Sequence, residues 1–178
     1  MMHFESDALI LHTPKNSDLV GLRRIMNDSK VYRLEPTYLP ESGLTPEEAL
    51  VKFQNLELER DRQCILGIYR KSDPETLVGL AELYDYKPSG RIISVGCRLA
   101  QDFWGCGIAT SCAEAMIEFL MAETQVSLIT AHCIPENLAS QKSLMKAGFE
   151  HLQTKYEDWG YAEPTRADIY AYNIERNN

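Results

Sequence analysis

Short apolar runs and longer stretches of helical periodicity alternate along this 178-residue chain. Runs that suit strands occupy residues 8–12, 64–69, 76–84, 91–99, 126–133, 149–156 and 167–174. Between them, patterns of apolar residues at helical spacing occupy residues 19–26, 50–56, 108–123 and 138–145. The predicted order is a strand, two helices, three strands, a helix, a strand, a helix and two strands.

Local signals fix several of these elements and their connections. Thr45, Pro46 and Glu48 form a capping box with a proline in the first turn, which predicts a helix start. Short polar turns join the three consecutive strands, so we expect an antiparallel meander there. The later strand–helix–strand order predicts a parallel pair with a right-handed crossover. No linker divides the chain, so residues 1–178 are expected to form a single domain, with residues 32–44 as a loop beside a binding site.

Composition and charge narrow the classes of function. No apolar run is long enough to cross a bilayer, and residues 1–5 lack a signal-peptide pattern, so we expect a cytoplasmic protein without a membrane partner. The net charge of −8 argues against a nucleic acid partner and is compatible with a cationic small molecule or a basic peptide. The five cysteines and four histidines form no disulfide framework and no metal-ligand pattern, so no metal is expected.

The most informative stretch, residues 101–110, lies between an apolar strand and the best helical pattern in the chain. Gly105 and Gly107 stand where the strand would turn into the helix. Backbone N–H groups in the first turn of a helix lack intrahelical partners, and glycine lets a large anion approach them. The junction is a candidate pyrophosphate cradle, and a plain tight turn is the alternative. Thr110 stands where a dinucleotide fingerprint has its third glycine, which disfavours that class of ligand.

Two motifs resemble those of the GNAT superfamily of acetyl-CoA-dependent N-acetyltransferases. Residues 102–110, DFWGCGIAT, are similar to that family's pyrophosphate loop, and residues 135–140, PENLAS, followed by KAGF at 146–149, are similar to its second signature. Together they look most like the branch containing the ribosomal-protein N-terminal acetyltransferases. The resemblance implies an α+β fold with a mixed, mostly antiparallel seven-stranded sheet, helices on both faces and a splayed parallel pair of central strands.

The resemblance also implies where acetyl-CoA, as co-substrate, would bind. The pantetheine arm would lie in the splay and contact the backbone of Arg98, Leu99 and Ala100. The loop N–H groups that would hold the pyrophosphate belong to Trp104, Gly105, Cys106, Gly107, Ile108, Ala109 and Thr110. Asn137 and Ser140 would reach the pantetheine and thioester from the next helix. As alternatives, Asn137 caps its helix and Ser140 is a small residue at a packing contact.

The chain departs from the family pattern at three positions. Asp102 replaces the usual Gln or Arg before the first glycine, and its carboxylate would repel phosphates, so we expect it to point away. Leu144 stands where many members carry a tyrosine that protonates the thiolate. Ser94 stands where others carry a glutamate that serves as base.

Other residues must then move the protons. Ser140, alone or through water, is the candidate proton donor to the sulfur, and Glu82, on the strand beside the splay, is the candidate base. Tyr84 and Asp85 follow Glu82 as candidate bases, and a solvent-facing Glu82 is the structural alternative.

The implied reaction is acetyl transfer to a primary amine, either a protein N-terminus or a small cationic amine, by direct attack in a ternary complex. Two loops, residues 32–44 and 157–164, would shape the acceptor pocket. A non-catalytic acetyl-CoA sensor or an interaction module is the alternative. Dimers are common among proteins that resemble this one, so a homodimer is also an expectation.

Overall fold

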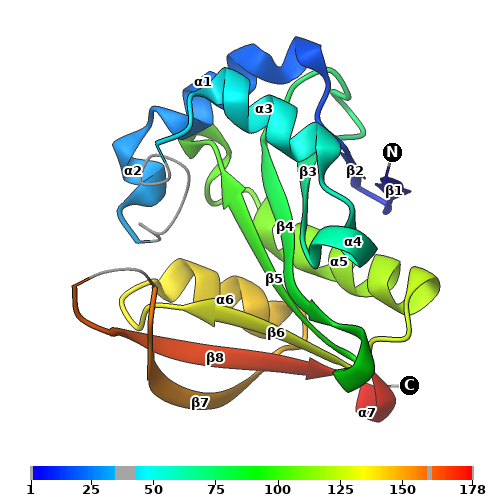
Figure 1. Cartoon of the computed structure of the whole chain (residues 1–178), viewed down its shortest axis with the longest axis vertical. Helices are drawn as coiled ribbons and strands as arrows, with labels where there is room; N and C mark the ends of the chain where they lie inside the picture. Colours follow the sequence, from blue (N-terminus) through cyan, green and yellow to red (C-terminus); the bar gives the residue numbers. More distant parts are fainter. Residues whose placement is uncertain (1, 35–42, 160–161, 178) are drawn as a thin grey trace.

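A computed structural model describes residues 2–34, 43–159 and 162–177. Its centre is one eight-stranded sheet with the strand order β1-β2-β3-β4-β5-β6-β8-β7 (Figure 1). The strands are β1 (His3–Glu5), β2 (Leu9–His12), β3 (Cys64–Arg70), β4 (Gly79–Lys87), β5 (Ile92–Leu99), β6 (Leu128–Cys133), β7 (Glu150–Glu157) and β8 (Thr165–Asn173). The sheet has one strand more than the seven predicted, because residues 3–5 add an edge strand that pairs antiparallel with β2.

The predicted meander and the predicted parallel pair are both present. β3, β4 and β5 pair antiparallel with their neighbours, and β5 and β6 pair parallel. β4 begins and ends three residues later than predicted, and its pairing with β5 is irregular between Tyr84 and Lys87, where Asp85 has a φ of 51°. The expected α+β class, mostly antiparallel with a single parallel pair, is confirmed.

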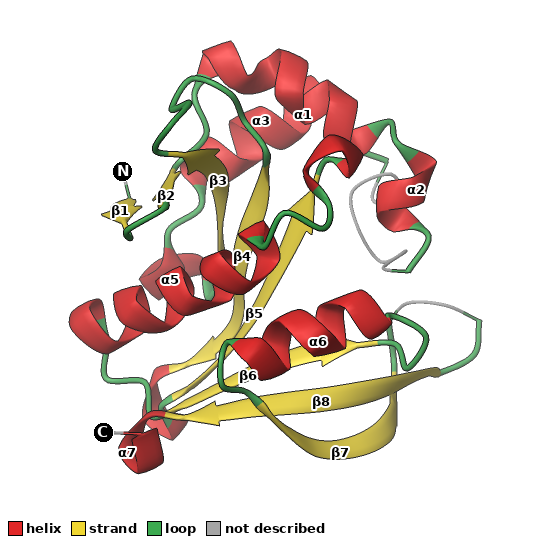
Figure 2. Cartoon of the chain, turned by 180° about the vertical axis from the view of Figure 1, so that it is seen from behind, coloured by secondary structure: helices red, strands yellow, loops and turns green. Residues whose placement is uncertain are grey.

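The helices lie on both faces of the sheet, as Figure 2 shows from behind. They are α1 (Leu19–Met26), α2 (Ser29–Tyr32), α3 (Pro46–Asn55), α4 (Leu58–Asp61), α5 (Ile108–Glu123), α6 (Leu138–Lys146) and α7 (Ile174–Asn177). Residues of α1, α2 and α3 form one apolar core with β3 and β4, and residues of α5 and α6 form a second core on the other face. The two faces of the sheet are therefore covered by different parts of the chain.

The helix boundaries follow the sequence signals closely. α5 has the bounds that its apolar periodicity predicts, and the capping box of Thr45 and Glu48 starts α3. The predicted core face of α6 is wrong in part: Leu144 is buried, but Leu138 and Met145 are 59% and 52% exposed. The loop predicted for residues 32–44 begins at the end of α2, and residues 35–42 of it lie outside the described residues.

Candidate active site

The parallel strands β5 and β6 pair over a short length and then separate. Their register covers three pairs, Ile92 with Leu128, Ile93 with Ile129 and Ser94 with Thr130. The hydroxyl oxygens of Ser94 and Thr130 lie 2.9 Å apart at the last pair. Beyond it β5 stays paired with β4 up to Leu99, and β6 stays paired with β8 up to Cys133, so the two strands diverge, as Figure 1 shows. The splayed parallel pair is confirmed.

A cavity of about 240 Å³ occupies this divergence, and we call it the gap cavity. It runs from the glycine loop, at Gly105 and Ala109, past residues 95–99 of β5 to Asn137 and Ser140 at the start of α6. Its walls are mostly apolar side chains from β5, β6, α5 and α6, among them Val95, Met116, Ala131 and Leu144. The cavity therefore suits a long, narrow ligand that enters at the glycine loop.

The glycine loop has the backbone conformation that a bare anion cradle requires. Gly105 and Gly107 have φ angles of 72° and 80°, in the left-handed region that favours glycine, and a Cβ at either position would meet no atom within 4 Å. No side chain of the described residues caps α5, and the first amide to bond the carbonyl of Gly107 belongs to Ser111. The N–H groups at this helix start therefore have no side-chain cap among the described residues, which is the arrangement expected of an anion site.

The structure also shows which other groups near the loop are already engaged. The indole N–H of Trp104 donates to the carbonyl of Leu99 at 2.9 Å, and the amide of Trp104 donates to Gln101. Both backbone groups of Ala100 are bonded within the chain, to Val78 and Phe103. Asp102 lies 3.6 Å from Arg24 in an exposed ion pair, which agrees with the expectation that its carboxylate points away. Of the three predicted β5 contacts, Arg98 and Leu99 line the gap cavity and Ala100 does not.

The start of α6 brings Asn137 and Ser140 to the gap cavity. The side-chain oxygen of Asn137 accepts from the amide of Ser140 at 3.2 Å, so Asn137 does cap its helix. Its amide nitrogen is not used in that bond. Leu144, at the position where the resemblance implies a tyrosine in many members of the family, also lines the gap cavity but supplies no proton. Of the predicted site residues, Ser140 is thus the one from α6 whose hydroxyl can donate a proton in the gap cavity.

A second, larger cavity of about 860 Å³ adjoins the gap cavity, and we call it the outer cavity. Its wall includes residues 157–159, part of the loop expected to shape the acceptor pocket; residues 160 and 161 of that loop lie outside the described residues. Five carboxylates and two cationic side chains line it: Asp61, Glu82, Asp85, Glu157 and Asp158, with Arg62 and Lys155. The outer cavity is therefore acidic and suits a positively charged ligand.

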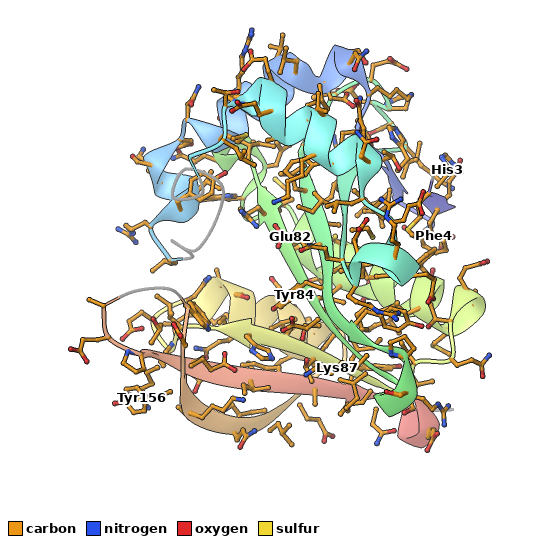
Figure 3. The ribbon with its side chains drawn as sticks, viewed as in Figure 1. His3, Phe4, Glu82, Tyr84, Lys87 and Tyr156 are labelled. Carbon is orange, nitrogen blue, oxygen red and sulfur yellow. The ribbon has the colours of Figure 1, made fainter. Side chains whose placement is uncertain are left out.

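Glu82 lies on β4 between the two helical layers, above Tyr84 in Figure 3. It forms an ion pair with Arg98, and the two side chains are only 4% and 3% exposed. The guanidinium of Arg98 also stacks over the ring of Tyr32 at 5.7 Å. The alternative of a solvent-facing Glu82 is therefore wrong, because the sheet face that carries it is covered. Its role as base stays a prediction.

His132 is a residue that sequence reasoning missed. It lies on β6 beyond the divergence, and its Nδ1 is 2.8 Å from the Oε2 atom of Glu157. The Glu157 carboxylate also accepts from the indole N–H of Trp159 at 3.1 Å and lies 3.2 Å from the ammonium of Lys155. These partners are far from His132 in sequence and form no motif, so they come together only because β6 pairs with β8 and β8 pairs with β7.

Gly96 and His132 line both cavities. A Cβ on Gly96 would stand 3.6 Å from the Glu82 carboxylate and 3.8 Å from the Tyr84 ring, so a methyl group fits there and a larger side chain meets those neighbours. The gap cavity and the outer cavity therefore share the wall at these two residues, and the absence of a side chain at Gly96 keeps that place open.

An apolar slot between separated strands, leading from an uncapped helix start to an acidic cavity, defines an acyl-coenzyme A-binding class of α+β protein. Residues 8–150 match the sequence profile of the acetyltransferase (GNAT) domain. The chain belongs to this family.

Two curated relatives are also described as N-acetyltransferases. The chain is 26% identical over 147 residues to the uncharacterized N-acetyltransferase YnaD of Bacillus subtilis (strain 168), covering 83% of this chain and 82% of that protein. It is 32% identical over 96 residues to the uncharacterized N-acetyltransferase YjdG of the same strain, covering 53% of this chain and 56% of that protein. The latter match thus spans little more than half of each protein.

Solved structures share the fold. A GNAT-family acetyltransferase from Bacillus anthracis superposes with a TM-score of 0.79 at 20% identity, covering 98% of this chain and 99% of the other. RimL, a ribosomal L7/L12 alpha-N-protein acetyltransferase solved with coenzyme A, gives 0.79 at 18% identity over 98% and 99%. AAC(6')-Ib, solved with paromomycin and acetyl-CoA, gives 0.75 at 18% identity over 95% of both chains.

The glycine loop can be tested by its backbone conformation. Alanine at Gly105 or Gly107 must adopt a left-handed conformation that costs about 1–2 kcal/mol, and relaxation of that strain moves the N–H groups. We expect Gly107→Ala to weaken acetyl-CoA binding about tenfold or more in titration calorimetry. Gly43→Ala is the matched control, because Gly43 also has a positive φ of 71° and open surroundings. Equal losses in both variants would contradict the assignment.

The buried ion pair predicts a large effect on stability. Glu82→Gln leaves the Arg98 charge buried without its carboxylate, so the free energy of unfolding should fall by about 3–5 kcal/mol in chemical denaturation. Replacing both residues with leucine should recover most of that loss. The exposed pair of Arg91 and Glu175, 3.0 Å apart, provides the control: Glu175→Gln should leave stability almost unchanged. A similarly small effect of Glu82→Gln would show that the pair is not buried in solution.

Proposed function

We propose that this chain transfers the acetyl group of acetyl-CoA to a primary amine. The observation that carries the proposal is the meeting of two unlike cavities at Gly96 and His132. One is narrow, mostly apolar and ends at an uncapped helix start; the other is wide and acidic. A thioester held in the first would present its acetyl group to an amine held in the second.

The gap cavity supports the predicted position of acetyl-CoA. The pyrophosphate would lie against the N–H groups of residues 105–110, and the pantetheine arm between β5 and β6. Beyond the Ser94–Thr130 pair the facing edges of these strands are not paired with each other, and the amides of pantetheine can supply hydrogen bonds there. RimL and AAC(6')-Ib, which share this fold, were solved with coenzyme A and acetyl-CoA.

The outer cavity supports a cationic acceptor. Its lining has five carboxylates and two cationic side chains, and Arg60 and Arg98 pair with Asp61 and Glu82 from outside the lining, so negative charge remains in excess. The chain also carries a net charge of −8, so a protonated amine is attracted both locally and at long range. Two proteins that share this fold have different associated molecules. RimL is named for a ribosomal protein, and AAC(6')-Ib was solved with paromomycin. A protein N-terminus and a small cationic amine therefore both belong in the first acceptor panel.

The reaction we propose is direct attack within a ternary complex. Holding the amine in line with the thioester carbonyl supplies much of the rate enhancement without a covalent enzyme intermediate. Ser140, which lines the gap cavity at the start of α6, is the proposed proton donor to the departing sulfur. For the proton on the amine the sequence offers Glu82, whose carboxylate lines the outer cavity.

Calorimetry with acetyl-CoA and a thiol-release assay over amines test the proposal together. The panel comprises a hexapeptide with a free N-terminus, spermidine and paromomycin. We expect acetyl-CoA to bind and at least one amine to raise the rate of CoA release. Ser140→Ala should lower kcat with little change in acetyl-CoA affinity, whereas Ser89→Ala, at an exposed serine that lines neither cavity, should change neither. Tight binding without amine-dependent release would favour the acetyl-CoA sensor, and no binding would leave an interaction module.

The shared wall gives a steric test. A methyl group at Gly96 would make ordinary contacts, whereas a valine would press on the Glu82 carboxylate and the Tyr84 ring where the cavities meet. We expect Gly96→Ala to keep most of the transfer activity and Gly96→Val to lose at least about 100-fold in kcat/KM, since a small misplacement of reactants is that costly. Acetyl-CoA affinity should fall far less. Full activity in the valine variant would show that acetyl transfer does not use this junction.

A further inference from the structure

His132 occupies the place where a base for the acceptor amine would have to stand. It is one of two residues shared by the gap cavity and the outer cavity, and the other, Gly96, has no side chain. The ring is partly buried, with 18% of its side chain exposed, and packs edge-on against the ring of Tyr84 with centroids 6.5 Å apart. An imidazole at this position can reach ligands in both cavities.

The partner of His132 fixes which ring nitrogen can accept a proton. Burial raises the pKa of Glu157, but hydrogen bonds from His132 and Trp159 and the nearby Lys155 outweigh it, so the pKa lies below its usual value. The carboxylate is therefore ionised and can only accept hydrogen bonds. Across the 2.8 Å contact, Nδ1 of His132 must carry the hydrogen and donate it. In the neutral ring this leaves the lone pair on Nε2.

We propose that Nε2 of His132 takes the proton from the acceptor amine and that Glu157 is the positioning residue that holds the ring for this step. The proposal rests on the proposed acetyl transfer. It applies a general arrangement in which a carboxylate on one ring nitrogen sets the tautomer and leaves the other nitrogen as base.

Glu82 is the competing base, and its surroundings differ. Its carboxylate is ion-paired with Arg98, and a nearby cation favours the ionised form, which makes a carboxylate a weaker proton acceptor. Among the described residues, the ion-pair partner of His132 is the carboxylate of Glu157, and no cationic side chain pairs with its ring. The charged and titratable groups that share the outer cavity with it are Glu82, Tyr84 and Asp85 from β4, Lys155, Tyr156, Glu157 and Asp158 from β7 and its end, and Asp61 and Arg62 from α4 and its end. Those that share the gap cavity with it are Lys30 from α2 and Cys97 and Arg98 from β5. The Glu157 carboxylate, 2.8 Å from Nδ1, faces the imidazolium formed in the step.

The protons balance as follows. One proton of the ammonium moves to Nε2 of His132 and then to water, and the neutral nitrogen attacks the thioester carbonyl carbon. The C–N bond forms and the C–S bond breaks. The second proton leaves the nitrogen as the amide forms, and one proton reaches the CoA sulfur through Ser140. The products are the acetylated amine, the CoA thiol and one proton released to solvent.

Steady-state kinetics over pH test the proposal with the panel amine that the wild type acetylates fastest and with hydroxylamine. An amine that is protonated in solution needs a base, whereas hydroxylamine is largely neutral at the same pH. We expect His132→Gln to lower kcat/KM for the protonated amine by about 100-fold or more and to remove the acid limb of its pH profile. Turnover of hydroxylamine should fall far less, and imidazole added to His132→Ala should restore part of the activity.

His151→Gln is the matched control, because His151 also lies on a strand beside a carboxylate, Asp168 at 3.5 Å, but lines neither cavity. It should change neither the rate nor the profile. Equal losses for hydroxylamine and the protonated amine in His132→Gln would indicate a structural role and overturn the proposal. Loss of the acid limb in Glu82→Gln, with its retention in His132→Gln, would assign the base to Glu82. If the wild type acetylates no amine, the proposed function itself fails.

Nitrogen-15 NMR of the histidine side chains gives a readout that needs no acceptor. We expect His132 in the neutral protein to carry its hydrogen on Nδ1, and Glu157→Gln to weaken that preference and lower kcat. A hydrogen on Nε2 of His132 in the wild type would overturn the proposal, because that nitrogen would have no lone pair to offer.

Discussion

The separation of β5 and β6 is the constraint on which the rest of the molecule depends. Each strand is held along its length by its outer neighbour, β4 or β8, but the two pair with each other only from Ile92 and Leu128 to Ser94 and Thr130. Backbone groups in the middle of a sheet normally find partners across the next strand. Here the next strand turns away, and a cavity takes its place. A ligand with amide groups along a thin chain can complete the hydrogen bonding that the fold leaves open.

The same separation divides the site into two chemical environments. The side of α5 and α6 supplies apolar walls and an uncapped helix start, while the side of β4, β7 and α4 supplies carboxylates and aromatic rings. In the proposed reaction, burial of the thioester would exclude water from the acyl group, and the acidic cavity would concentrate cations beside it. A single backbone position without a side chain, Gly96, lies where the two environments meet.

Buried polar groups on this face of the sheet are paired across strands. Ser94 bonds Thr130, Glu82 pairs with Arg98, and His132 bonds Glu157. Burying such groups is costly unless partners satisfy them, and removing one partner exposes the full cost. These pairs hold the side chains in defined positions beside the cavities. Side chains held in defined positions serve an active site more than they serve stability, since well-packed apolar residues stabilise a core at least as well.

The sequence by itself determined the longer elements, the parallel pair, the glycine turn and the family, because these depend on local rules. Periodicity set α5, the capping box set α3, and positive φ angles require Gly105 and Gly107. The edge strand at residues 3–5 was missed, since three residues carry too little pattern, and the exposed Leu138 and Met145 show that a helical stripe does not tell which residues a neighbour will cover. Only the tertiary structure decided that Glu82 is paired with Arg98 and that His132 meets Glu157. Those contacts join strands that are distant in sequence, and strand order and register, which bring such residues together, are long-range properties of the packed chain.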